Sequence, residues 1–103
     1  MSKEKDRLLS NLKQLAELMT RMFGDQCEVT IHDVTTQQMQ LVHITGNVTG
    51  RAPGAPVTDV VARPLLTYGD AVKDRHCFMT LTDDGRELKS STSYIRDSKG
   101  KVV

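Results

Sequence analysis

The chain has 103 residues, of which 38% are hydrophobic and 26% are charged. This composition is typical of one globular domain and excludes disordered and fibrous classes. No run approaches the roughly 20 apolar residues that cross a bilayer, and the first residues lack the apolar stretch of a secretory signal. With 14 basic and 13 acidic residues, the chain also lacks the basic excess of a domain that binds nucleic-acid phosphates. We therefore expect a cytoplasmic domain that contacts neither a membrane nor, by itself, DNA.

Residues 5–23 are expected to form a helix, because apolar residues recur at alternating spacings of four and three and Gly24 follows as a C-terminal cap. The stripe consists of Leu8, Leu12, Leu15, Met19 and Met22. Such a stripe either packs on its own domain or forms the seam of an interface between two copies. Both interpretations stay open, and these five residues are the candidate homodimer interface.

Alternating apolar and polar residues predict strands over 27–34 and 40–46. The glycines and prolines of residues 47–57 indicate a loop. A helix is expected to begin near Thr58, but Pro64 lacks an amide donor and clashes with the preceding turn. We therefore expect two short helical pieces, 58–63 and 64–68, that end at Gly69.

Two further strands, 76–82 and 87–96, flank an Asp-Asp-Gly-Arg segment that suits a tight reversal, so this region is predicted to be a hairpin. Residues 97–100 form a second such turn, and residues 101–103 begin another strand. The resulting order is a helix, two strands, a short helical crossover and three strands joined by tight turns.

This order of elements resembles that of PAS domains, and over roughly residues 8–103 the sequence is similar to the YheO-like PAS family. The motifs that carry the resemblance occur in the same order along the chain. They are Phe23-Gly24, Cys27-Glu28-Val29, His32-Asp33, GNVTGR at 46–51, PVTD at 56–59, DGR at 84–86, LKSST at 88–92, IRD at 95–97 and GKV at 100–102.

The resemblance implies an α+β fold in which residues 1–103 form a single PAS-like sensor domain. It implies a five-stranded antiparallel sheet of order 2-1-5-4-3, an N-terminal helix and short crossover helices. The family's members are bacterial cytoplasmic transcriptional regulators whose C-terminal helix-turn-helix contacts DNA. These 103 residues leave no room for that half and stop within the expected fifth strand. We therefore expect an excised domain in which a second copy, added residues or a shifted pairing completes the sheet.

Metal binding and catalysis are not expected, because the candidate side chains do not converge. Cys27 and His32 lie five residues apart on one strand and face opposite sides, as do adjacent His76 and Cys77. A disulfide between the two cysteines is excluded for a similar reason, since two strands separate theirs in the PAS order. Asp33 is interpreted as a turn residue that caps backbone donors. We expect no cofactor and no enzyme.

The candidate ligand-binding residues are polar side chains near the expected junction of sheet and helices: Asn47, Thr49, Arg51, Ser90 and Thr92. The guanidinium of Arg51 suits a carboxylate or phosphate. Alternatively, Arg51 forms an ion pair with Asp59 or Asp33, and the hydroxyls bind backbone groups or water.

By resemblance, the domain would bind a small metabolite or a partner protein and signal through the packing of a dimer. The alternative function is a dimerisation module without a ligand.

Overall fold

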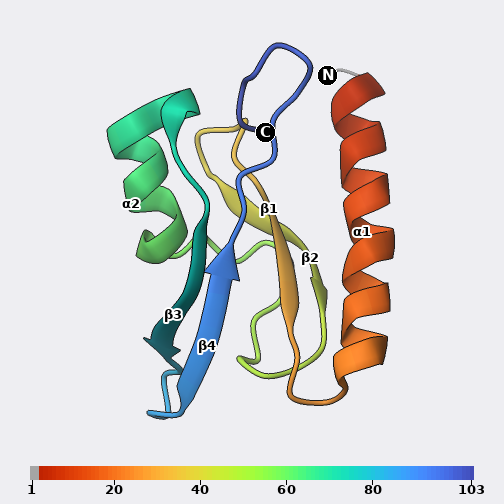
Figure 1. Cartoon of the computed structure of the whole chain (residues 1–103), viewed down its shortest axis with the longest axis vertical. Coiled ribbons are helices and arrows are strands. Elements are labelled where there is room, and N and C mark those ends of the chain that lie inside the picture. Colours follow the sequence, from red (N-terminus) through yellow and green to blue (C-terminus); the bar gives the residue numbers. More distant parts are fainter. Residues whose placement is uncertain (1–2) are drawn as a thin grey trace. The chain divides into compact units, whose positions relative to one another are not determined.

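The computed structural model describes residues 3–103, which divide into two compact units (Figure 1). The first unit runs to residue 57 and includes Val103, and the second spans Thr58–Val102. The elements are α1 (Lys3–Phe23), β1 (Val29–Asp33), β2 (Gln40–Thr45), α2 (Asp59–Tyr68), the 3-10 turn η1 (Gly69–Ala71), β3 (Arg75–Leu81) and β4 (Glu87–Thr92). The predicted α+β class with an N-terminal helix and antiparallel strands is confirmed.

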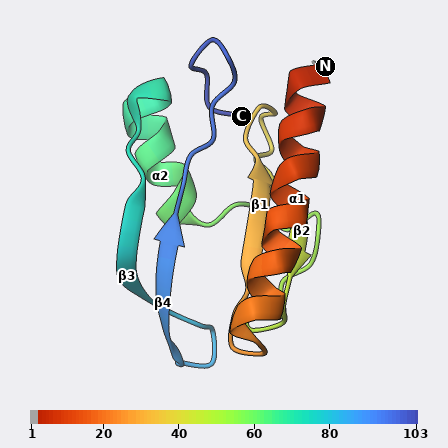
Figure 2. The same ribbon diagram turned by 45° about the vertical axis from the view of Figure 1, so that its right-hand side comes forward.

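In the first unit, α1 packs on the antiparallel hairpin of β1 and β2 (Figure 2). Ile31 and Leu41 are buried in this hairpin, and a bulge follows Ile31. Ala16 is buried on the helix, and its carbonyl accepts a hydrogen bond of 3.1 Å from Thr45 Oγ1 at the end of β2. A small side chain at position 16 therefore lets the strand approach the helix backbone.

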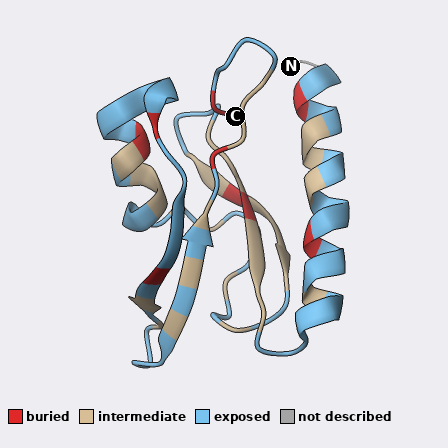
Figure 3. Ribbon diagram, viewed as in Figure 1, coloured by how far each residue is buried: buried red, intermediate tan, exposed pale blue. Residues whose placement is uncertain are grey.

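The second unit contains α2, η1 and the antiparallel hairpin of β3 and β4. Its buried apolar side chains are Leu65, Val72, Phe78, Tyr94 and Val102 (Figure 3). The hydroxyl of Tyr94 donates to the carbonyl of Val61 on α2 at 2.9 Å. Burial, followed by the nearby Asp74 carboxylate, raises the pKa of this hydroxyl. It stays protonated and holds the segment after β4 against α2.

The expected five-stranded sheet is not formed, since the described residues contain two separate two-stranded sheets. The last three residues contribute one isolated bridge, between Arg96 and Val102. In addition, the carbonyl of Val103 accepts a hydrogen bond of 3.1 Å from the amide of Val34, one residue after β1. These contacts are too few for a strand ladder.

The strand β4 also ends four residues earlier than predicted, at Thr92. The reason is the carboxylate of Asp74, which accepts hydrogen bonds of 2.8 Å from the Tyr94 amide and from Ser93 Oγ. This side chain takes the backbone donor that a longer ladder would need.

The expected break at Pro64 is wrong, because α2 is a single helix with Pro64 inside it. The missing amide would have bonded to the carbonyl of Val60, in the first turn of a ten-residue helix. The proline therefore removes one hydrogen bond near the helix start, while the amides of Val61 and Ala62 both bond to Thr58. The predicted end at Gly69 is confirmed by a positive φ of 58° there.

Candidate functional site

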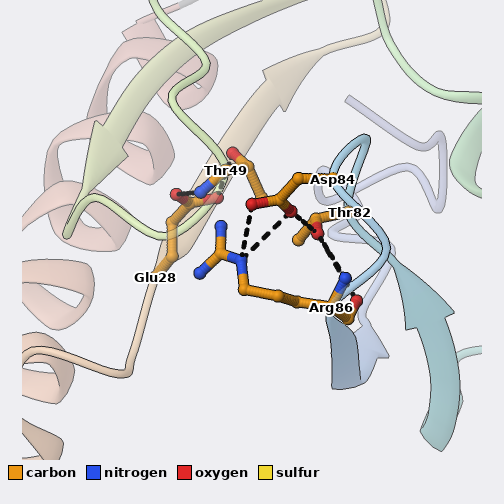
Figure 4. Close-up of polar contacts among 5 residues, drawn as sticks. All are labelled: Glu28, Thr49, Thr82, Asp84 and Arg86. Carbon is orange, nitrogen blue, oxygen red and sulfur yellow. Dashed lines mark hydrogen bonds and ion pairs between the residues drawn. The ribbon is translucent and has the colours of Figure 1, made fainter.

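The loop that follows β2 is anchored by the carboxylate of Glu28. Glu28 Oε2 accepts hydrogen bonds of 2.8 Å from the amides of Val48 and Thr49, and Oε1 accepts one of 2.8 Å from Thr49 Oγ1 (Figure 4). Thr49 is thus used to hold the loop, which agrees with the interpretation that its hydroxyl serves the fold. Asn47 is exposed in the same loop.

Arg51 ends this segment and does not form either of the ion pairs considered from the sequence. Its Nη2 donates to the carbonyl of Pro56 at 2.6 Å, and Thr49 Oγ1 lies 3.4 Å from its amide nitrogen. No other described residue accepts a hydrogen bond from the guanidinium, which is only partly buried. The remaining donors of the planar group are therefore available to an anion.

His32 on β1 lies close enough to Arg51 to respond to its charge. Burial, followed by the positive charge of Arg51, lowers the pKa of His32 below 6.5. Its Nε2 is buried without a hydrogen-bond partner among the described residues, as is Nε2 of His43 on β2. An imidazole nitrogen without a partner and a guanidinium with remaining donors are groups that can bind a hydrogen-bonding atom and an anionic group, respectively.

A partly buried ion pair lies at the other end of β1. Lys5 Nζ lies 2.7 Å from Asp33 Oδ2 and 2.7 Å from Thr35 Oγ1, and Asp33 Oδ1 accepts hydrogen bonds from the amide and hydroxyl of Thr35. Burial alone would raise the pKa of Asp33, but the hydrogen bonds from Lys5 and Thr35 outweigh it and lower the pKa. The predicted capping role of Asp33 is confirmed, whereas Lys5 was not foreseen as its partner.

The hydroxyls predicted on β4 follow the expected alternation. Ser90 and Thr92 lie on the more buried face together with Leu88, and their neighbours are exposed. Ser90 Oγ shares a hydrogen bond of 2.8 Å with Thr80 Oγ1 on β3. The partner of this hydroxyl is therefore another side chain and not the backbone group or water that was expected. Asn47, Thr49 and Arg51 belong to the first unit and these two residues to the second.

The turn between β3 and β4 is held by its own side chains. Thr82 Oγ1 donates to Asp84 and accepts from the Arg86 amide, while Arg86 Nε lies 3.1 Å from both carboxylate oxygens of Asp84 (Figure 4). Hydrogen bonds from Thr82, followed by those from Arg86, lower the pKa of Asp84. The DGR motif therefore has a structural role in shaping this reversal.

Sequence reasoning missed a second structural cluster, centred on Arg96. Its guanidinium donates to the carbonyls of Asp70, Val72 and Tyr94. The carboxylate of Asp70 accepts a hydrogen bond from the amide of Val102. These contacts tie η1 to the segment after β4. The IRD motif carried no signal for this role because two of the accepting carbonyls, those of Asp70 and Val72, come from a distant part of the chain.

The candidate dimer stripe of α1 divides between two environments. Leu8 and Leu12 are partly buried, whereas Leu15, Met19 and Met22 are exposed. Leu18 and Phe23, which the narrow stripe did not include, are also exposed. One part of the predicted stripe thus packs within the unit, and the other part is free.

Both cysteines are free thiols. Within residues 3–103, no group of three or more His, Cys, Asp or Glu side chains could hold a metal ion. In the same part of the chain, every helix is too short or too polar to span a bilayer.

Comparison with known proteins gives one family match and several relatives. The family model described as the YheO-like PAS domain matches residues 3–103. The chain is 27% identical to protein YheO of Escherichia coli K12 over 99 residues, which cover 93% of this chain and 41% of YheO. It is 26% identical to the transcriptional regulator DauR of Pseudomonas aeruginosa over 103 residues, which cover all of this chain and 47% of DauR.

The chain therefore spans less than half the length of these relatives. No solved structure shows a significant match.

Proposed function

Because the chain belongs to the YheO-like PAS domain family, we propose that it is the sensory domain of a bacterial transcriptional regulator. In this proposal the domain is cytoplasmic, has no catalytic activity, and binds a small metabolite or a partner protein. DNA is contacted by a separate helix-turn-helix part of the regulator. The observation that carries the proposal is the similarity over the whole chain to DauR, a relative named as a transcriptional regulator.

The ligand site in this proposal is built around Arg51 and His32. Apart from the Nη2 group that donates to the Pro56 carbonyl, Arg51 supplies charged donors that no described residue uses, and His32 supplies a buried nitrogen without a partner among the described residues. Glu28 fixes the loop that presents Arg51 through its hydrogen bonds with Thr49, and Asn47 and Thr49 remain proposed ligand contacts. Ser90 and Thr92, on β4 of the second unit, remain a separate prediction of ligand-binding hydroxyls. The ligand class is a small molecule with a carboxylate or phosphate group.

The proposal also includes a fifth strand and a homodimer. The hydrogen bond from the Val34 amide to the Val103 carbonyl supports a fifth strand that pairs with the end of β1 at Val103. The exposed apolar residues of α1 support a second copy as partner. Ligand binding would then act by favouring one packing of the dimer over another.

Native mass spectrometry of protein purified without added ligand tests the site. We expect a retained small molecule, and we expect Arg51→Gln to weaken its retention at least about tenfold, as for loss of a charge-assisted hydrogen bond. Arg63→Gln is the matched control, because Arg63 is 80% exposed and lies 3.8 Å from Asp59. Retention that is unaffected by Arg51→Gln would rule out this site.

A dimerisation module without a ligand is the second candidate. The exposed apolar face of α1 favours it, since that face needs a partner but no small molecule. A purified protein that retains nothing, and that is dimeric, would support this candidate over a sensor.

A further inference from the structure

His32 lies on the face of the β1–β2 hairpin that is turned away from α1. The next residue, Asp33, reaches Lys5 on α1 with its carboxylate. Because neighbouring residues of a strand point to opposite faces, the imidazole of His32 points away from that helix. The positive charge of Arg51, in the loop after β2, lowers the pKa of His32, so the guanidinium lies near this ring.

The loop that carries Arg51 is fixed against β2, but it leaves most of the guanidinium unused. The amide of Leu41 donates to the carbonyl of Ala55 at 2.8 Å, and Leu41 is the residue that pairs with His32 across the hairpin. Within residues 3–103, the carbonyl of Pro56 is the single acceptor of the guanidinium. The other N–H groups of this planar fork can therefore bind an oxyanion.

The charged groups around His32 do not include a carboxylate that acts on its ring. Arg51 is the one charged group of the described chain that shifts the pKa of His32. Asp33 is paired with Lys5 on the α1 side. Glu28 lies four residues, or about 13 Å, away along the strand, where its carboxylate binds amides of the loop after β2.

A proton on His32 is disfavoured as long as no anion is bound. The Nε2 atom is buried and has no acceptor among the residues that the structure describes. Burial, followed by the charge of Arg51, lowers the pKa of the ring, so it is neutral at pH 7. An oxyanion on the guanidinium would remove both obstacles, because it cancels the positive charge and accepts a hydrogen bond from the imidazolium.

We propose that an oxyanion bound at Arg51 also accepts a hydrogen bond from His32, and that this ring takes up a proton from solvent when the anion binds. The anion site itself rests on the proposed function, and the proton uptake adds regulation of that site by pH. Because linkage between two ligands is reciprocal, the anion then binds more tightly as pH falls. The gain ends below the pKa of His32 in the anion-free chain, where the ring is protonated in both states.

His43 provides an internal reference for this coupling. It pairs with Ile31, the residue before His32, and therefore lies on the opposite face of the hairpin. Its Nε2 is also buried without a partner in the described part of the chain. An anion at Arg51 should change the NMR signals of His32 and leave those of the His43 ring in place.

Sulfate is the probe, because its charge is constant between about pH 5 and pH 8, whereas a phosphate titrates in that range. The chain is refolded from urea to remove small molecules, and NMR follows the histidine rings and the arginine side chains at constant ionic strength. We expect sulfate to move the midpoint of the His32 titration to higher pH. We expect its Kd to be at least about fivefold lower at pH 5 than at pH 8, the lower end of typical coupling between sites.

His32→Gln keeps a side chain that forms hydrogen bonds but cannot titrate in this range, so we expect the pH dependence of the sulfate Kd to be lost. His76→Gln is the matched control, because His76 is an exposed histidine of the second unit. This variant should keep the wild-type pH dependence.

A His32 midpoint that is the same with and without sulfate, while the Arg51 signals respond to sulfate, would overturn the coupling and leave the proposed anion site standing. Sulfate that affects neither Arg51 nor His32 would contradict both the coupling and the site. A pH dependence that His32→Gln retains would also overturn the coupling, since the proton would then be taken up elsewhere.

Discussion

Gly46 marks a position where one methyl group would disrupt the first unit. Its φ is +83°, and a Cβ built there would lie 2.1 Å from the carbonyl oxygen of Cys27. Gly50 has a similar φ of +74° but no atom within 4 Å of that Cβ. Substitutions at the two glycines therefore distinguish the cost of a side chain at positive φ from the cost of a clash with the Cys27 backbone.

We expect Gly46→Ala to lower the free energy of unfolding by about 3 kcal/mol or more, because the Cys27 backbone must move. For Gly50→Ala we expect a loss of about 1–2 kcal/mol, the cost of a side chain at positive φ. Urea unfolding monitored by circular dichroism measures both values. Equal losses would show that the Cys27 carbonyl does not crowd position 46.

The Lys5–Asp33 pair makes stability depend on pH in acid. The pKa of Asp33 in the folded chain is lowered below 3.8, so its contribution is complete above that value and is lost as pH falls through the folded pKa. We expect Asp33→Asn to cost about 3 kcal/mol at pH 7, because it leaves Lys5 beside a neutral group. The difference from the wild type should shrink below about pH 4.

Urea titrations at pH 7 and pH 3 measure this change. Asp59→Asn is the control, because that carboxylate is 89% exposed and its effect should stay below about 1 kcal/mol. An Asp33→Asn deficit that is the same at both pH values would contradict the role of the carboxylate charge.

At the level of elements, the second unit depends on the geometry of one arginine. Arg96 reaches three backbone carbonyls, on Asp70, Val72 and Tyr94. A lysine ammonium is a single point charge and cannot match this planar arrangement. The structure therefore requires the arginine fork and not merely a positive charge.

We expect Arg96→Lys to destabilise the chain by about 2 kcal/mol, because the partly buried carbonyls of Val72 and Tyr94 lose their donors. Arg63→Lys should change stability by less than about 0.5 kcal/mol, since its ion pair is exposed and long. Hydrogen exchange would place the Arg96→Lys effect in η1 and the segment after β4. Protection there equal to that of the wild type would refute this role.

The elements were predictable where local signals dominate. The periodicity of α1, the alternation of β1 and β2 and the turn before Arg86 all depend on residues close in sequence. The continuity of α2 through Pro64 and the early end of β4 were not predictable. Both depend on where one backbone donor goes, and Asp74, which accepts the hydrogen bond from the Tyr94 amide, lies twenty residues earlier, between η1 and β3.

At the level of the whole molecule, sequence reasoning identified the loop of Arg51 but not what surrounds it. Glu28 was noted only as part of a family motif, yet its carboxylate fixes that loop. Lys5 stood at the start of the expected helix with no partner assigned, yet it is 7% exposed and its ammonium lies beside Asp33. Long-range pairs of this kind leave no spacing pattern in a single sequence. The family motifs therefore predicted the function class more readily than the contacts.

The central claim is that one domain couples a bound ligand to dimer packing. The most direct test compares the dimer dissociation constant of protein as purified with that of protein freed of small molecules by refolding from urea. The account predicts at least about a fivefold difference, the lower end of typical coupling between sites. Identical constants, in protein shown by native mass spectrometry to have lost its ligand, would contradict it.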